Sequence, residues 1–264
     1  MLCLFSVAVN ATKGNSPDIP QRIISLAPHI TELLYAIGAE KQLIATVEYS
    51  DYPQAALKLP RVGNVFALDW ERIISYRPDL LVAWESIPAS SMARLKTLNV
   101  PVVILKPEQL GSIARDINTL GKATGHSQQA AQVAKSFLQD LGKLVTRYQH
   151  RKSVRVFLEI SHQPIYTVNG EQIISDAITL CGGKNVFADL GVLAPVVGVE
   201  AVLKAAPEVM IYAGPESIKS VRDDWSRWAA LPQPQSIEPD ILNRATPRML
   251  QGIQQLCEAI QRAR

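Results

Sequence analysis

The feature of this sequence that most constrains its fold is a short unit that occurs twice. Residues 69–82 read DWERIISYRPDLLV, and residues 198–211 read GVEAVLKAAPEVMI. Each copy has a glutamate in an opening helical turn, then an apolar pair, a proline, an acid and a β-type run. When Glu71 is aligned with Glu200, the copies stay in step at an offset of 129 residues (200 − 71). The repeat predicts two lobes of similar topology, whose matching helices occupy equivalent positions.

A second match, at an offset of 144 residues (174 − 30), supports this division. Residues 30–32, which precede Gly38, align with residues 174–176, which precede Gly182. Two such lobes would face each other across a cleft, with the two aligned glutamates as a pair. A glutamate in a first helical turn also complements the helix macrodipole, so a purely local role is the alternative.

Strands alternate with helices on both sides of a long helical stretch. We expect a strand that runs into a turn at 22–28, and strands at 43–47, 80–84, 100–105, 154–160 and 209–212. We expect helices at 29–37, 70–76, 91–98, 173–180, 199–205 and 247–262. Such alternation is typical of α/β lobes whose parallel sheets are covered by helices on both faces.

The strand pattern is interrupted between Pro107 and Lys152. One helix is expected at 108–124, and a longer helix is expected to begin with Ser127 as its cap. The longer helix has an apolar stripe at i, i+3 and i+4 spacing and some 22 residues, so it would extend about 33 Å. A helix of this length can serve as a rigid spacer between two α/β units.

These patterns predict two Rossmann-like α/β lobes with parallel sheets, joined by a long rigid backbone helix. The expected parts are 1–19 for a residual signal peptide and linker, 20–106 for the N-terminal lobe, 107–152 for the helical linker and 153–264 for the C-terminal lobe. Apolar residues make up 47% of the chain, which favours a globular fold over disorder. The net charge is only +3 and basic residues are scattered, so we expect no nucleic-acid partner.

The N-terminus reads MLCLFSVAVNATKGN, which resembles the second half of a secretory signal with cleavage after Ala11. The basic segment that normally begins such a signal is missing, and the alternative is a first β-strand. No later stretch is apolar over the ~20 residues that cross a bilayer. We therefore predict an exported protein.

Two cysteines, Cys181 and Cys257, lie outside this N-terminal segment and are 76 residues apart (257 − 181). An even pair tends to close in an oxidising compartment. Both also lie in apolar helical patterns, so the spacing leaves two buried free thiols as the alternative.

No constellation of catalytic residues is present in the sequence. The four histidines lack zinc-binding spacing, and the chain has neither a nucleophile-elbow nor a phosphate-loop motif. His29 and His162 each follow a strand in their own lobe, where α/β folds place ligands. We therefore expect a binding protein with no catalytic residue, no metal site and no cofactor of its own.

Aromatic residues gather at strand ends and in the loops near them. They are Tyr49, Tyr52, Phe66, Trp84 and Tyr166. Large aromatic side chains at such positions suit a large, partly apolar ligand.

Several segments together resemble the periplasmic substrate-binding proteins of the helical-backbone class (class III). These segments are RIISLAPHITELLYAIG, YSDYP, the ERI and PDLLVAW parts of the first repeat, the long helix and CGGKNVF. Within this class, the sequence is similar to the cobalamin-binding proteins of ABC importers from about Arg22 to its C-terminus. The resemblance implies a monomeric periplasmic protein that captures a corrinoid such as cobalamin (vitamin B12) and delivers it to an ABC importer.

The resemblance also implies roles for individual residues. Glu71 and Glu200 would dock on arginines of the two permease subunits in the inner membrane, and the two cysteines would form a disulfide. The candidate ligand-binding residues are Tyr49, Phe66, Trp84, His162, Tyr166, Asp240 and Arg244. The last two match a polar pair near the amide side chains of the ligand.

Two departures from that family affect the expected size of the site. Val65 and Ala194 stand where the cobalamin binders have tryptophans, and each lost ring can bury about 150–250 Å². A looser site for a related corrinoid is therefore one alternative. Another is haem or a ferric chelate (siderophore), as in sister families, with Tyr49, Tyr166 or His162 as an iron ligand.

Two further alternatives belong to other classes of protein. A tetrapyrrole chelatase would need a histidine and a carboxylate across the cleft, such as His29 or His162 with Asp240. The predicted export and disulfide argue against such an enzyme, which would work in the cytosol. A purely structural protein would leave the aromatic residues unexplained.

Overall fold

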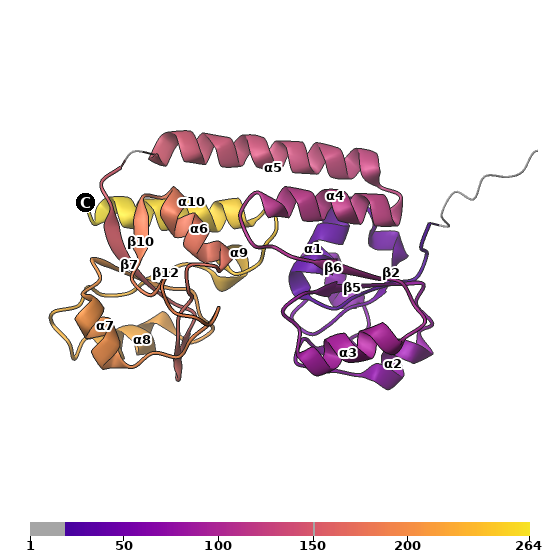
Figure 1. Ribbon diagram of the computed structural model, residues 1–264, viewed down its shortest axis with the longest axis horizontal. Helices are drawn as coiled ribbons and strands as arrows, with labels where there is room; N and C mark the ends of the chain where they lie inside the picture. The colour runs from indigo at the N-terminus through magenta and orange to yellow at the C-terminus, as the bar shows by residue number, and fades with distance from the viewer. Residues whose placement is uncertain (1–18, 150) are drawn as a thin grey trace, which may run out of the picture.

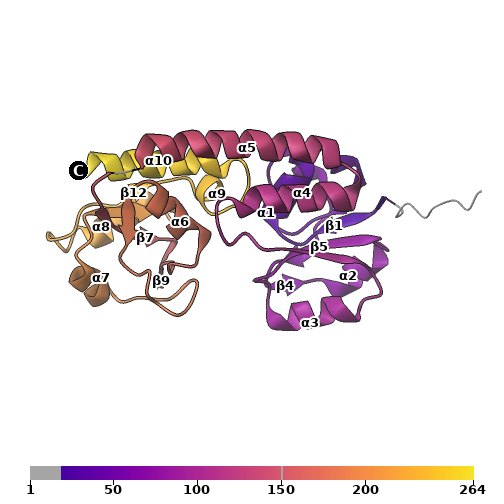
Figure 2. The same ribbon diagram turned by 45° about the horizontal axis from the view of Figure 1, so that its top comes forward.

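A computed structural model describes residues 19–149 and 151–264. The predicted signal peptide, with its cleavage point after Ala11, lies outside the described residues. Two α/β lobes lie next to each other beneath a layer of long helices (Figures 1 and 2). The predicted fold is therefore confirmed. Among the described helices, none is long and apolar enough to cross a membrane.

The N-terminal lobe is built on a parallel sheet with the strand order β2-β1-β5-β6. Its strands are β1 (Ile23–Ser25), β2 (Leu43–Ala45), β5 (Leu80–Trp84) and β6 (Val102–Leu105). Its helices are α1 (Pro28–Ala36), α2 (Trp70–Ser75) and α3 (Ala89–Thr97), with 3-10 turns η1 (Glu40–Gln42) and η2 (Gln54–Lys58) and a hairpin of β3 (Gly63–Asn64) and β4 (Ala67–Leu68). Alternate residues of β5 pack on opposite faces: Val82 joins the core beneath α1, and Leu81 joins the core beside α2 and α3.

The C-terminal lobe repeats this architecture around a parallel sheet with the order β10-β7-β11-β12. Its strands are β7 (Val154–Glu159), β10 (Gly183–Asn185), β11 (Val209–Tyr212) and β12 (Gln235–Ser236). Its helices are α6 (Ile173–Leu180), α7 (Val199–Ala205), α8 (Ile218–Trp225) and α9 (Pro239–Leu242), with a hairpin of β8 (Ser161–His162) and β9 (Ile165–Tyr166). When the strands of each sheet are numbered in chain order, both sheets have the spatial order 2-1-3-4. The two lobes therefore share one topology.

The repeated sequence unit forms equivalent structures in the two lobes. In both copies the residue before the proline has a left-handed backbone conformation, with φ of 46° at Arg77 and 45° at Ala206. The acid after the proline, Asp79 or Glu208, accepts a main-chain hydrogen bond from the start of its lobe's first strand, at 2.8 Å in both lobes. The unit therefore occurs twice because each copy ends a helix and fastens the following strand to the first strand of its lobe.

A layer of helices joins the lobes. It consists of α4 (Ser112–Thr124), α5 (Ser127–Tyr148) and the C-terminal helix α10 (Met249–Arg262). Both views show α5 lying along the other two helices and extending over both lobes (Figures 1 and 2). The 22 residues of α5 match the predicted backbone helix, which at 1.5 Å per residue is about 33 Å long.

Two predicted details of these helices were wrong. The helix expected at 108–124 begins only at Ser112, because residues 109–112 form a turn in which the Ser112 N–H donates to the Gln109 carbonyl at 2.9 Å. The N-cap of α5 is His126 rather than Ser127, and no side chain caps this helix end.

One continuous apolar cluster extends through both lobes and the helical layer. Its members include Ile23 in β1, Ile117 in α4, Phe137 in α5, Val156 in β7 and Ile253 in α10. The opposite face of each sheet has its own smaller cluster. Because a wide separation of the lobes would expose part of the shared cluster to water, the fold favours a nearly fixed arrangement of the lobes.

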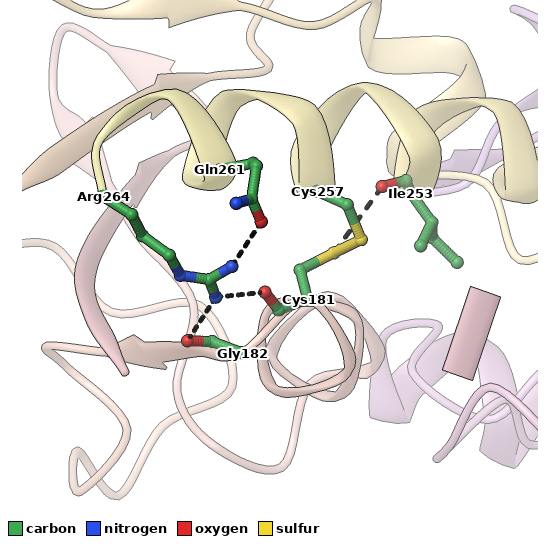
Figure 3. The surroundings of a disulfide bond; sticks show 6 residues. All are labelled: Cys181, Gly182, Ile253, Cys257, Gln261 and Arg264. Atoms are coloured by element: carbon green, nitrogen blue, oxygen red, sulfur yellow. Dashed lines mark hydrogen bonds between the residues drawn. A yellow bond between two sulfur atoms is a disulfide. The ribbon is translucent and has the colours of Figure 1, made fainter. Parts of the chain in front are cut away.

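The predicted disulfide is confirmed (Figure 3). Cys181 directly follows α6 and is bonded to Cys257 in α10, and both side chains are fully buried. The guanidinium of Arg264 donates to the carbonyl oxygen of Cys181 at 2.9 Å and of Gly182 at 3.3 Å. The disulfide therefore ties the C-terminal helix to the C-terminal lobe, and the alternative of two free thiols is excluded.

Candidate ligand-binding site

A cavity of about 920 Å³ lies between the two lobes. On the N-terminal side it is lined by residues at or just beyond strand ends, including His29, Trp84 and Pro107. On the C-terminal side it is lined by the start of α6 and by residues 243–245. The carboxyl ends of parallel strands are where α/β folds bind ligands, and the volume suits a large small-molecule ligand.

Trp84 and His29 meet edge to face in one wall of this cavity, with ring centroids 5.6 Å apart and an interplanar angle of 87°. Burial lowers the pKa of His29 to about 4, with a smaller contribution from the charge of Arg244, so the imidazole is neutral near pH 7. Its Nε2 is buried and has no hydrogen-bond partner within the described part of the chain. This wall therefore combines an indole with a neutral, unpartnered polar atom.

Arg244 connects the two lobes from inside the cavity. Its Nη1 donates to Glu32 at 2.8 Å and to Asp51 at 2.7 Å. Its Nη2 lies 2.7 Å from the Asp240 carboxylate and donates to the Tyr49 carbonyl at 3.1 Å. The guanidinium thus donates three hydrogen bonds and also forms an ion pair with Asp240. The expected polar pair Asp240–Arg244 is formed, but the same arginine also holds the opposite lobe.

Glu32, on α1, is the most buried partner of Arg244, with its side chain 3% exposed. Its second oxygen accepts a hydrogen bond from Thr246 Oγ1 at 3.2 Å, and Arg248 lies 3.8 Å from its first oxygen. Burial raises the pKa of Glu32, and these three partners only partly oppose that shift. The result is a buried interlobe network rather than a free carboxylate for a ligand.

The aligned acid of the other lobe makes a comparable contact. Asp176 lies on α6, at the position that the 144-residue offset pairs with Glu32. Its Oδ2 accepts a hydrogen bond from the main-chain N–H of Leu110, in the segment that leads into α4, at 2.8 Å. Glu32 and Asp176, which the second sequence match aligns, therefore both contact residues outside their own lobe.

The other predicted aromatic residues are not among those that line the cavity. Tyr49 and Phe66 are 75% and 82% exposed, and Phe66 follows Val65, which does line the cavity. Tyr166, in β9, is half-buried. Ala194 is exposed and follows another lining residue. The structure thus brings Trp84, Val65 and Arg244 into the lining, and the ligand contacts of Tyr49, Phe66 and Tyr166 stay predictions.

His162 is also absent from the cavity lining, as are Tyr49, Phe66, Tyr166 and Asp240. Its Nδ1 lies 2.5 Å from Glu159 Oε1, and its Nε2 lies 3.1 Å from Asp224 Oδ2. The Trp225 indole N–H donates to the second Glu159 oxygen at 2.8 Å. Because both ring nitrogens have carboxylate partners, the structure weighs against His162 as a ligand contact or an iron ligand, and its role stays a prediction.

Several acidic residues of the cavity were not predicted from the sequence. Glu85, Glu108, Glu171 and Asp176 all line it. A signal for the first was present, because Glu85 directly follows the strand that ends at Trp84. Within residues 19–149 and 151–264, no group of three or more histidine, cysteine or acidic side chains is arranged to hold a metal ion.

Glu71 and Glu200 are both exposed, and each is the second residue of its helix, α2 or α7. In both views these helices lie on the side of the lobes that faces away from α5 (Figures 1 and 2). Both helices thus lie on one common side of the molecule, and the two glutamates are exposed.

Two lobes of equal topology that share a helical layer and enclose a cavity define a two-lobed substrate-binding protein. Residues 23–228 match the family of periplasmic binding proteins. The chain belongs to this family, and it is a substrate-binding protein of transport rather than an enzyme such as a chelatase.

Within the family, the chain is similar to the vitamin B12-binding proteins of Yersinia pestis and Yersinia pseudotuberculosis. It is 37% identical to each over 240 residues, which cover 90% of this chain and 85% of theirs. It is also similar to the solved periplasmic vitamin B12 binding protein of Vibrio cholerae, with 36% identity and a TM-score of 0.87 over 92% of this chain and 98% of that one. A periplasmic haem-binding protein of a Roseiflexus species has a TM-score of 0.80 over 92% and 98% of the two chains, but at 22% identity it shows the fold alone.

Proposed function

We propose that this protein captures cobalamin, or a closely related corrinoid, in the interlobe cavity and delivers it to an ABC importer. The observation that carries the proposal is the 37% identity to vitamin B12-binding proteins over 90% of the chain. That similarity extends over both lobes and hence over both walls of the cavity. The proposed location is the periplasm, and the Cys181–Cys257 disulfide supports it because disulfides persist in oxidising compartments.

The ligand contacts that we propose combine the lining with the aromatic residues around it. Trp84 would pack on the corrin inside the cavity, and Tyr49, Phe66 and Tyr166 would close on it from the edges. The large exposed fractions of Tyr49 and Phe66 support this role, because they leave both rings accessible to a ligand. Asp240, whose carboxylate is less buried than the Arg244 side chain, would accept hydrogen bonds from ligand amides.

The importer contact that we propose uses Glu71 and Glu200. One carboxylate on each lobe would meet an arginine of a permease subunit, and such charge-assisted contacts give orientational specificity. A monomer suffices for this arrangement, because one chain supplies both glutamates, on helices α2 and α7 at the same side of the molecule.

Haem or a ferric chelate is the second candidate ligand. The similar fold of the Roseiflexus haem-binding protein favours it, but only at the level of the fold. The two carboxylate partners of His162 weigh against that residue as an iron ligand. Tyr49 and Tyr166 would then be the tyrosines to supply one.

Titration calorimetry of the full chain tests the proposal, with cyanocobalamin, haem and a ferric siderophore measured in parallel. We expect one-to-one binding of cyanocobalamin, and weaker or absent binding of the iron compounds. Tight binding of haem or the chelate, with none of cyanocobalamin, would reject the corrinoid and keep the fold.

A matched pair of variants locates the ligand. Tyr49→Ala removes an aromatic ring near the cavity that is 75% exposed, so it should weaken cyanocobalamin binding without loss of stability. Leu57→Ala removes an apolar side chain that is 56% exposed in η2 and does not line the cavity, so it should leave binding unchanged. Equal effects of the two variants would place the ligand elsewhere.

A further inference from the structure

The charged side chains that line the cavity are mostly acidic. Glu85, Glu108, Glu171 and Asp176 line it, and Arg244 is the one cationic side chain that does so in the described parts of the chain. This imbalance bears on the charge of the ligand. The inference drawn from it rests on the proposed function, since it concerns the same cavity.

Arg244 does not offset these four carboxylates, because its charge is already matched within the protein. The carboxylates of Glu32, Asp51 and Asp240 lie 2.8, 2.7 and 2.7 Å from its terminal nitrogens. Its guanidinium also donates three hydrogen bonds within the protein, to Glu32, Asp51 and the Tyr49 carbonyl. A ligand carboxylate that approached Arg244 would therefore also meet three carboxylates of the protein.

The start of α6 contributes the least compensated charges. Glu85 lies 2.8 Å from Lys106, and Glu108 lies 3.8 Å from Arg115. Glu171 and Asp176 have no cation within 4.0 Å among residues 19–149 and 151–264. The positive end of the α6 dipole offsets at most about half a unit charge, so this wall stays negative.

His29 provides an independent observation on the opposite wall. It lines the cavity, and its Nε2 is buried without a hydrogen-bond partner in the described residues. The imidazole is neutral near pH 7, since its pKa is about 4. This wall therefore supplies a polar group but no positive charge for an anionic ligand.

We infer that the cavity selects a neutral or cationic, amide-bearing tetrapyrrole and discriminates against ligands with free carboxylates. Side-chain amides of a corrin can donate N–H bonds to the acidic lining, whereas the two propionates of haem can only accept. Repulsion between carboxylates is stronger in a partly enclosed cavity than in bulk water. The acidic lining thus acts as a filter on ligand charge.

The test compares cyanocobalamin with a monocarboxylic derivative in which one propionamide has been hydrolysed to the acid. The two differ by a single charge and are almost identical in shape. In titrations of the full chain, we expect the acid to bind about tenfold more weakly, which corresponds to about 1.4 kcal/mol. The difference should shrink at about 1 M salt, where the screening length falls to about 3 Å.

A double variant and a control assign the effect to the lining. Glu108→Gln with Glu171→Gln removes two lining charges from exposed side chains, so the fold should be retained, and the penalty on the acid should largely disappear. Asp140→Asn removes one charge on α5, away from the cavity, and should leave the penalty unchanged.

The outcomes separate this inference from the proposed function. Equal affinity of the acid and cyanocobalamin for the unmodified protein would overturn the charge filter and leave the cobalamin function intact. If cyanocobalamin does not bind, the affinity of haem is compared with that of its dimethyl ester, which lacks the free carboxylates. Tighter binding of the ester would retain the filter and reject cobalamin, whereas tighter binding of haem, or no binding of either, would overturn both.

Discussion

Arg244 and Glu32, which are 212 residues apart in the sequence, form an ion pair at 2.8 Å that joins the two lobes. The side chains are only 10% and 3% exposed. The pair lies beside the ligand cavity, so one arginine contributes to the cavity wall and also holds the lobes in a fixed relation.

Loss of this arginine should destabilise the protein. Arg244→Ala would leave Glu32 buried without its main counter-charge. We expect the free energy of unfolding to fall by about 3 kcal/mol. This value is at the low end of the range for broken buried ion pairs, because water can enter the cavity. Urea unfolding measures this change. Adding Glu32→Gln should recover at least about 1 kcal/mol, since a neutral amide needs no counter-charge. The interpretation fails if the double variant is no more stable than Arg244→Ala.

His162 should make the stability of the C-terminal lobe depend on pH. Burial alone would lower its pKa, but the hydrogen bonds and charges of Glu159 and Asp224 raise the pKa above the usual 6.5. A raised pKa in the folded state stabilises the fold fully below pH 6.5, and this contribution is lost as the pH rises through the folded-state pKa. Two more titratable groups, Glu216 and Tyr212, lie beside His162. Glu216 accepts hydrogen bonds from the His162 main-chain N–H and from the Tyr212 hydroxyl.

Unfolding measured from pH 6 to 9 tests this contribution, with His162→Gln as the matched control. Glutamine keeps a donor and an acceptor at this position but does not titrate. The unmodified protein should lose more stability than the variant as the pH rises above 6.5. Parallel pH curves would show that His162 makes no such contribution.

The disulfide should contribute much of the stability of the C-terminal lobe. It closes a loop of 76 residues, which on the chain-entropy model corresponds to about 4–5 kcal/mol. We expect the free energy of unfolding of the double variant Cys181→Ala, Cys257→Ala, measured with urea, to be lower by this amount. In reducing buffer, the unmodified protein should have the same stability as this variant. A loss below about 1 kcal/mol would contradict the model.

The two exposed glutamates should affect transport without affecting ligand affinity. Replacing Glu71 and Glu200 by alanine removes both proposed permease contacts, and we expect uptake by reconstituted importer vesicles to fall about tenfold or more. Asp140→Ala with Glu258→Ala removes equal charge from α5 and α10 and should leave uptake unchanged. An equal loss of cyanocobalamin affinity in the first variant would assign these glutamates to the cavity instead.

Ligand binding should change the shape of the molecule very little. The shared apolar cluster and the Arg244 network both resist separation of the lobes. In small-angle scattering we expect the radius of gyration to change by less than about 1 Å on binding, as for other preorganised binders. A large compaction would show that the lobes open widely without ligand.

Much of the fold was predictable because it depends on local patterns and on the repeat. The helix at 199–205 and the strand at 209–212 have the predicted bounds, since apolar spacing and a proline mark their ends. The strand expected at 43–47 ends at Ala45, and Thr46 instead forms an isolated bridge with Arg61. Helix α8 was not predicted, because only Val221 and Trp225 of its eight residues are buried.

The candidate site was less predictable, because its contacts join distant parts of the chain. Trp84 was found from its place at a strand end. The pairing of Arg244 with Glu32 depends on how two lobes pack, and no short-range spacing encodes it. The carboxylate partners of His162 were not predictable for the same reason, because one of them, Asp224, lies on the unpredicted helix α8.

The central claim is that a corrinoid binds between the lobes, and the most direct measurement is a crystal structure of the full chain with cyanocobalamin. We expect one corrin in the cavity lined by Trp84, His29 and Arg244, with Tyr49 and Tyr166 closing on its edges. A corrin bound outside this cavity, or an empty cavity at saturating ligand, would contradict the account.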